Sequence, residues 1–283
     1  MQVLFPQTCS ELQAMLAAMP QGRMMAGGSD LLVKLRQTGE APPAVFCLDR
    51  LTELHQLGWQ GEDYVIGAAV SLQQLLETAD FAKNFACLHQ AIGELASPPI
   101  RHAATLGGNL CSASPAADSV PALIVLEAGV DIEGPGGRRS LPVDGFILGP
   151  GKNGLRSGEF VRAVRLPRPP QDLVSSYHKV GRRKAMAIAV ASLAAAYRLT
   201  ADGEVAMIRL AWGSVGPTVI RGGEVEGFIC GRPLTEDVLR QAGALARQAV
   251  KPIDDIRASA DYRRSLAGNL LLRLLPGAIA GEG

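Results

Sequence analysis

The chain has 283 residues, of which 28 are basic and 27 acidic, so its formal net charge at pH 7 is +1. A chain of this length holds two or three compact units and can bury a sizeable core. So small a net charge gives no field that attracts nucleic acid or anionic lipid, which disfavours nucleic-acid binding.

Local patterns predict short strands and helices in alternation along the first part of the chain. A capping box at residues 8–11 precedes a helix over residues 11–18, and Ser71 caps another helix. The remaining predicted elements are strands over residues 23–26, 44–48 and 63–69, helices over 72–78 and 85–95, and a hairpin of 129–133 with 138–143. This alternation is typical of α/β packing.

A dense run of prolines at residues 167–170 predicts a boundary, because proline fits neither a central strand nor a helix interior. Beyond it, residues 189–199 and 204–212 predict an antiparallel hairpin. Helices are expected over residues 238–250, after a cap at 235–237, and over 261–275, ended by Pro276-Gly277. The leucine stripe of the last helix, Leu270, Leu271, Leu274 and Leu275, is expected to be core, with docking of a partner subunit by part of it as the alternative.

No membrane span is expected, because the long apolar run over residues 185–197 is too short and too rich in alanine. The first six residues lack the basic and apolar regions of a signal peptide, so a cytoplasmic protein is expected. The cysteines are scattered singly, which argues against metal ligation and disulfides and predicts that most are buried. They are Cys9, Cys47, Cys87, Cys111 and Cys230.

Two glycine pairs, Gly27-Gly28 and Gly107-Gly108, lie about eighty residues apart and predict an anion-binding backbone. Each has small polar residues beside it, and the apolar spacing after Asp30 predicts a helix beneath the first pair. Neither pair spells G-x-G-x-x-G, which disfavours a Rossmann domain. A single pair is more often a plain turn, but two together favour a pyrophosphate site.

Asp118 ends an irregular, small-residue stretch that begins at Asn109. It is interpreted either as the N-cap of the apolar run that follows or as an acceptor of ribose hydroxyls. A ligand with both phosphate and ribose would explain a carboxylate so close to the glycines.

These motifs make the chain resemble the FAD-binding subunits of the molybdenum hydroxylases, most of all those of bacterial xanthine dehydrogenases. The resemblance is carried by AGGSDLL at 26–32, PPIRHAATLGGNLCSASPAAD at 98–118, DGFILGPGK at 144–152, YHKVGRRKAMAIA at 177–189 and DYRRSLAGNLL at 261–271. It implies an α+β fold with a two-lobed FAD-binding domain of the vanillyl-alcohol-oxidase/PCMH type over 1–170, whose lobes span about 1–55 and 56–170. A smaller α/β C-terminal domain of the CO dehydrogenase flavoprotein type, with an antiparallel sheet, would span 171–283.

The resemblance also implies which residues contact FAD, and it assigns no catalytic side chain and no metal ligand to this chain. The pyrophosphate would meet both glycine pairs, the ribose would meet Asp118, and Lys179 would lie near the flavin ring, where its charge would favour reduction. The implied set is Met24, Met25, Ala26, Gly27, Gly28, Ser29, Asp30, Leu31, Ile100, Thr105, Gly107, Gly108, Asn109, Cys111, Ser114, Asp118, Val161 and Lys179. Met186 stands where the family commonly has an acid.

The implied function is electron transfer within a multi-subunit oxidoreductase. Electrons would come from iron–sulfur clusters on one partner subunit, fed by a molybdenum site on another, and would leave FAD for NAD+ or another acceptor. The alternatives are a self-standing FAD-dependent oxidase or reductase, and a non-catalytic nucleotide-binding assembly module. Lys179 has its own alternative, because it lies in a basic run, 179–184, that would be solvated on general grounds. A further alternative is that this basic run contacts the acidic face of a partner or a nicotinamide phosphate.

Overall fold

The computed structural model describes residues 1–183 and 186–275. The chain forms two compact units, and each takes three separate segments of the sequence. Unit 1 comprises Met1–Ala79, Ala96–Ala113 and Glu127–Arg168, and unit 2 comprises Asp80–Leu95, Ser114–Leu126 and Pro169–Gly283.

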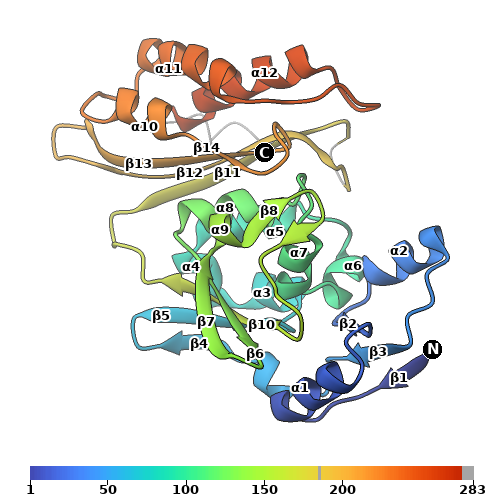
Figure 1. Ribbon diagram of the computed structural model, residues 1–283. Helices are drawn as coiled ribbons and strands as arrows, with labels where there is room; N and C mark the ends of the chain where they lie inside the picture. The colour runs from blue at the N-terminus through green and yellow to red at the C-terminus, as the bar shows by residue number, and fades with distance from the viewer. Residues whose placement is uncertain (184–185, 276–283) are drawn as a thin grey trace. The chain divides into compact units, whose positions relative to one another are not determined.

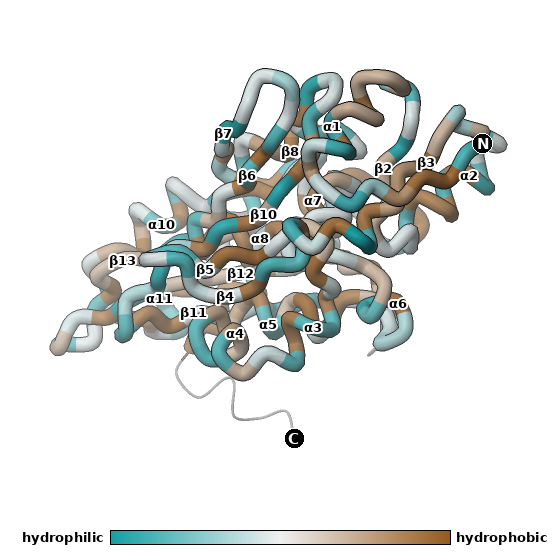
Figure 2. Tube along the Cα trace, turned by 90° about the horizontal axis from the view of Figure 1, so that it is seen from below, coloured by the Kyte–Doolittle hydropathy of each residue, from teal (hydrophilic) through white to brown (hydrophobic). Residues whose placement is uncertain are grey.

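The first sheet of unit 1 has three parallel strands in the order β1-β3-β2. The strands are β1 (Gln2–Leu4), β2 (Arg23–Met25) and β3 (Ala44–Cys47), and they are joined through α1 (Cys9–Ala18) and α2 (Leu31–Thr38). The central strand β3 is buried throughout, and its tube is brown in Figure 2. Thr8 caps α1 by accepting the Glu11 N–H at 3.1 Å, which confirms the predicted cap; the helix begins two residues earlier than predicted.

The second sheet of unit 1 has five antiparallel strands in the order β4-β5-β10-β6-β7. They are β4 (Leu57–Gln60), β5 (Asp63–Gly67), β6 (Gly129–Gly134), β7 (Gly137–Pro142) and β10 (Phe160–Pro167). The predicted β6–β7 hairpin is confirmed, whereas β4 and the central strand β10 were not predicted. The other elements of unit 1 are η1 (Thr52–Leu54), α3 (Leu72–Glu77), α6 (Pro98–Ala103), α7 (Leu106–Ser112), α9 (Val143–Phe146), β8 (Ile147–Gly149) and β9 (Lys152–Asn153).

Arg162, at a β-bulge in β10, connects the second sheet of unit 1 to η1 and α1. The bulge interrupts the pairing of β10 with β6 between Val161 and Ala163. From this position the Arg162 guanidinium pairs with Glu133 on β6 at 2.8 Å and with Glu53 on η1 at 3.2 Å. Glu53 in turn accepts the backbone N–H of Cys9, at the start of α1, at 2.9 Å. One half-buried cation therefore connects three elements that are far apart in sequence.

A second ion pair fixes the segment that leads into β10. Arg139 on β7 binds Glu159 in a two-pronged arrangement at 2.6 and 2.8 Å, and it also donates to the Gly154 carbonyl oxygen at 2.7 Å. The two hydrogen bonds from Arg139 to the Glu159 carboxylate, and the one from the Arg156 backbone N–H, lower the pKa of Glu159 to about 2. The Glu159 side chain is 11% exposed, so water screens the pair only partly.

Acid should weaken unit 1 through this pair. A carboxylate whose pKa is depressed in the folded state contributes stability above the unfolded-state pKa, about 4.3, and loses it as pH falls toward 2. We expect Glu159→Gln to be less stable than wild type at pH 7, with the difference shrinking over that acid range. Urea unfolding as a function of pH measures this. Equal stabilities at pH 7 would contradict the expectation.

Unit 2 is built on a four-stranded antiparallel sheet in the order β11-β12-β13-β14. The strands are β11 (Val174–Gly181), β12 (Ala189–Leu199), β13 (Val205–Gly213) and β14 (Ile220–Arg221). The predicted antiparallel hairpin is confirmed as β12–β13. Strand β11, which carries Lys179, was not predicted.

Helices cover both faces of this sheet, as Figure 1 shows. On one face lie α10 (Gly223–Ile229), α11 (Glu236–Ala249) and α12 (Ala260–Asn269). On the other lie α5 (Ala86–Gly93) and α8 (Ser119–Val125), and α4 (Ala79–Asn84) precedes α5. The predicted cap of α11 is confirmed, because the Thr235 hydroxyl accepts the Val238 N–H at 3.4 Å.

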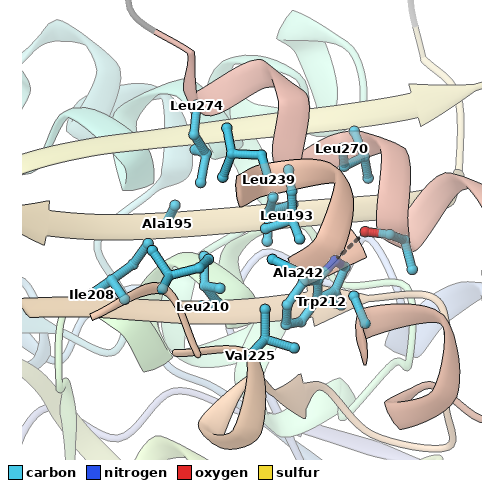
Figure 3. Close-up of a cluster of buried hydrophobic side chains, with 14 of the residues drawn as sticks. Leu193, Ala195, Ile208, Leu210, Trp212, Val225, Leu239, Ala242, Leu270 and Leu274 are labelled. Carbon is cyan, nitrogen blue, oxygen red and sulfur yellow. Dashed lines mark hydrogen bonds between the residues drawn. The ribbon is translucent and has the colours of Figure 1, made fainter. Parts of the chain in front are cut away.

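The core of unit 2 lies between the sheet and α10–α12 (Figure 3). Trp212 is fully buried there and donates its indole N–H to the Ala267 carbonyl oxygen at 2.9 Å. The leucine stripe is core, as predicted, with Leu270, Leu271 and Leu274 all buried. The last helix is shorter than predicted, because α12 ends at Asn269 and a 3₁₀ turn, η2 (Leu270–Leu274), follows. The predicted stop at Pro276-Gly277 lies outside the described residues.

One other prediction needs correction. The stretch that begins at Asn109 is not irregular throughout, since residues 106–112 form α7. The prediction that most cysteines are buried is confirmed, because three of the five are buried, while Cys111 is half-buried and Cys230 is exposed. Within residues 1–183 and 186–275, no helix combines the length and the apolar character that crossing a membrane requires.

Candidate functional site

The first glycine pair follows β2 and leads into α2, so the predicted helix beneath it is confirmed. A Cβ atom on Gly27 would lie 1.6 Å from the Ala103 carbonyl oxygen, at the end of α6. Gly28 has φ +68°, a left-handed conformation that favours glycine. The fold itself therefore requires both glycines, the first for close approach of two backbones and the second for the turn.

The second glycine pair occupies the first turn of α7. Thr105 caps this helix by accepting the Gly108 N–H at 3.0 Å. A Cβ atom on Gly107 would lie 2.6 Å from Ala68, so packing requires that glycine. A Cβ atom on Gly108 would approach only the Thr105 hydroxyl, at 3.0 Å, and Gly108 is exposed. Of the four glycines in the two pairs, Gly108 is the one at which packing and backbone conformation require glycine least.

The two glycine pairs are neighbours in unit 1. Besides the contact of Gly27 with Ala103, the Ser112 hydroxyl at the end of α7 donates to the Asp30 carboxylate at 2.7 Å. Asp30 also pairs with Lys34 on α2 at 2.7 Å. Burial acts to raise the pKa of Asp30, but the hydrogen bonds from Lys34 and Ser112 outweigh it and lower that pKa. Asp30 stands at the start of α2 without capping it, and its carboxylate links the two segments.

The remaining predicted residues of unit 1 offer mostly apolar surface. Ile100 on α6 is 42% exposed, so its side chain is available for an apolar contact. Val161, by contrast, is buried in β10 beside the bulge. Burial raises the pKa of the Cys111 thiol to about 12, so this cysteine stays protonated and behaves as an apolar group. Half-buried side chains complete the first segment: Met24, Met25, Ala26 and Leu31.

Three predicted residues, Ser114, Asp118 and Lys179, lie in unit 2. Ser114 is exposed, and its hydroxyl accepts the Ala116 backbone N–H at 3.3 Å. Asp118 and Lys179 form a buried ion pair of 2.8 Å, with side chains 7% and 4% exposed. The alternative of a solvated Lys179 is therefore wrong.

Asp118 is the centre of a small polar network. One of its oxygens accepts the Lys179 ammonium, and the other accepts the Tyr177 hydroxyl at 2.7 Å. Lys179 also donates to the Glu94 carbonyl oxygen at 3.0 Å, which ties β11 to the end of α5. Asp118 occupies the N-cap position of α8 but makes no capping hydrogen bond. Its carboxylate serves the network, not the helix.

Burial is the main influence on the pKa values of this network. It raises the pKa of Asp118, while the Lys179 ammonium and the Tyr177 hydroxyl act to lower it. Burial and the Asp118 charge also raise the pKa of Tyr177, so the phenol stays protonated and remains a donor. Tyr177 was not among the predicted site residues. A strand prediction over 174–181 would have found it, because residues two apart on a strand point to the same face.

Comparisons with known proteins place the chain in a family. Residues 1–169 match the family model described as the FAD binding domain in molybdopterin dehydrogenase, and residues 175–278 match the CO dehydrogenase flavoprotein C-terminal domain. The xanthine dehydrogenase FAD-binding subunit of Escherichia coli O157:H7 is 32% identical over 278 residues, which cover 98% of this chain and 95% of the relative.

Solved structures show the same fold over nearly the whole chain. Carbon monoxide dehydrogenase from Hydrogenophaga pseudoflava gives a TM-score of 0.93 at 29% identity and covers 99% of this chain and 97% of the matched chain. Quinoline 2-oxidoreductase from Pseudomonas putida 86 gives 0.93 at 27% identity, with the same coverage. The predicted α+β fold class and the FAD cofactor are confirmed. The chain belongs to the FAD-binding subunits of the molybdenum hydroxylases, which are oxidoreductases.

Proposed function

We propose that this chain is the electron-transfer subunit of a multi-subunit, xanthine dehydrogenase-like molybdenum hydroxylase. Its FAD would receive electrons from iron–sulfur clusters on a partner subunit, and a molybdenum-binding subunit would oxidise the substrate. NAD+ or another acceptor would take the electrons from FAD. The observation that carries this proposal is the adjoining pair of glycine segments in unit 1, where Gly108 leaves the backbone at the first turn of α7 exposed.

The residues of unit 1 fit the proposed cofactor. Gly108 is exposed and its backbone is not hidden by a Cβ atom, so it suits the close approach of a pyrophosphate. Exposed Ile100 and the protonated Cys111 supply the apolar contacts that the rings of a flavin dinucleotide need. When bound, FAD supplies the hydride and single-electron chemistry, and the protein holds and orients it.

The contribution of unit 2 is proposed from the resemblance and from the buried network. Asp118 and Ser114 remain proposed contacts of the ribose and its surroundings. Lys179 would place a positive charge near the flavin ring, and its ammonium is held by Asp118, whose other oxygen accepts the Tyr177 hydroxyl. The division into a FAD-binding domain over 1–170 and a C-terminal domain over 171–283 is likewise proposed.

The visible spectrum of the purified chain, followed by release and identification of its chromophore, tests the FAD site. We expect FAD in the wild type and a much lower FAD content in Gly108→Ala. Alanine favours a helix by about 1 kcal/mol over glycine, which offsets the close contact of the new Cβ with the Thr105 hydroxyl, so the variant should fold about as well as wild type. Gly227→Ala, at an open helical position in α10, is the matched control that should keep its FAD.

Two results would count against this proposal. A colourless wild-type chain that refuses added FAD would remove the cofactor from it. Full FAD content in Gly108→Ala would remove that backbone position from the site. NADH formation by the purified complex, compared with the reduction of an artificial acceptor, distinguishes NAD+ from other acceptors.

A further inference from the structure

An exposed group of aliphatic and arginine side chains lies at the end of the unit 2 sheet. It lines a cavity of about 410 Å³ between the β11–β12 connection and the loop before α12. We call it the isoleucine–arginine patch and define it as Arg182, Arg183, Met186, Ile188, Ile256 and Arg257.

The aliphatic side chains of this patch are unusually exposed. Ile256 is 89% exposed, and Met186 and Ile188 are each 52% exposed. Nearby on the same loop, Ile253 is 72% exposed. Scattered single aliphatics are normal on a surface, but a cluster around one cavity is typical of an interaction site. Covering these side chains would recover the free energy of removing apolar area from water.

The loop that presents Ile256 is held by a buried arginine. Arg263 on α12 donates to the Val190 and Ser214 carbonyl oxygens at 2.7 and 2.9 Å and to the Asp255 carboxylate at 2.7 Å. Asp255 also accepts the backbone N–H groups of Arg257 and Ala258, at 2.8 and 3.2 Å. A segment so fixed presents Ile256 at little cost in conformational entropy.

Two of the three arginines of the patch carry positive charge that the described residues do not neutralise, whereas Arg257 pairs with Asp255 at 3.0 Å. Arg182 donates to the Ile256 carbonyl oxygen at 3.2 Å, and Arg183 donates to the Met186 carbonyl oxygen at 2.8 Å. Within residues 1–183 and 186–275, neither guanidinium forms an ion pair with a carboxylate. Backbone carbonyl groups orient these arginines but do not compensate their charge, so the patch complements an acidic surface.

We infer that the isoleucine–arginine patch docks another protein chain of the same complex, one that presents carboxylates around an apolar side chain. This inference rests on the proposed function, because it requires a multi-subunit complex. A small anion would use the arginines alone and leave the aliphatics in water. A protein surface covers both, and it pairs desolvated arginines with aliphatic anchors as interface hot spots do.

The test uses the complex purified from native cells through an affinity tag on this chain. We expect Ile256→Asp and Arg183→Glu each to lower the iron and molybdenum that co-purify per mole of this chain by about tenfold or more, which corresponds to a typical hot-spot loss. FAD content and far-UV circular dichroism should stay at wild-type values. Leu199→Asp and Arg240→Glu, on exposed parts of β12 and α11, are the matched controls.

Each outcome decides the inference. Wild-type amounts of iron and molybdenum with both patch variants would overturn it. An unchanged complex with a raised KM for the electron acceptor in Arg183→Glu alone would assign the patch to a small anion instead. A wild-type chain that is dimeric by itself, and monomeric as Ile256→Asp, would assign it to a second copy. Failure of the proposed function shows differently, because the wild type itself would then carry no iron or molybdenum.

Discussion

Gly27→Ala should lower the free energy of unfolding by about 3 kcal/mol or more and should remove bound FAD. The added Cβ would lie 1.6 Å from the Ala103 carbonyl oxygen, and because this atom belongs to the backbone it cannot turn aside as a side chain can. Either α6 or the first glycine segment must shift. Urea unfolding and the flavin absorbance of the purified variant measure the two effects.

The control for this substitution is Gly227→Ala, where an added Cβ meets nothing within 4 Å and φ is not positive. It should be unchanged or more stable by up to about 1 kcal/mol. A Gly27→Ala protein that unfolds at the wild-type urea concentration and carries a full complement of FAD would show that the two backbones do not meet as described.

Lys179→Met should cost about 3 kcal/mol of stability, because it leaves the Asp118 carboxylate buried without its cation. The pair is 2.8 Å apart and both side chains are more than nine-tenths buried, so water cannot compensate. Adding Asp118→Asn to this variant should restore part of the loss, since the neutral amide can still accept the Tyr177 hydroxyl. A double-mutant cycle by urea unfolding measures the coupling.

Lys83→Met is the matched control, because Lys83 is exposed on α4 of the same unit. A surface substitution of this kind should change stability by no more than about 0.5 kcal/mol. If Lys179→Met changed the free energy of unfolding no more than Lys83→Met does, the ion pair would contribute nothing to stability. Asp118→Ala should destabilise unit 2 as well as weaken any ribose contact, because it leaves the Lys179 ammonium buried without its carboxylate.

Local signals predicted the elements whose formation depends on neighbours in sequence. The cap at Thr8, the cap at Ser71 and the two hairpins were read correctly because a hydroxyl or a glycine turn acts within a few residues. The two missed long strands depend on distant partners. In β10 the bulge at Arg162 breaks the two-residue alternation, and in β11 the buried face carries Tyr177 and Lys179.

In the candidate site, too, local features could be predicted and features that depend on distant partners could not. The sequence identified both glycine pairs as special, but it could not separate their roles, because those roles depend on which atoms lie opposite. Gly27 and Gly107 are fixed by Ala103 and Ala68, which only the fold brings near them. The pairing of Asp118 with Lys179 was also invisible, since the two are 61 residues apart and nothing local couples them.

The interleaving of the two units limits how the protein can be made or cut. The chain passes from one unit to the other five times, and the face of the C-terminal sheet opposite α10–α12 is covered by α5 and α8, which are translated long before it. During synthesis the apolar faces of α5 and α8 stay uncovered until the sheet forms, so these helices can aggregate or be bound by chaperones. In a fragment that ends at residue 170 the apolar faces of α5 and α8 would stay uncovered permanently. The two family-model matches are therefore separable as stretches of sequence, but they should not survive separation as folded proteins.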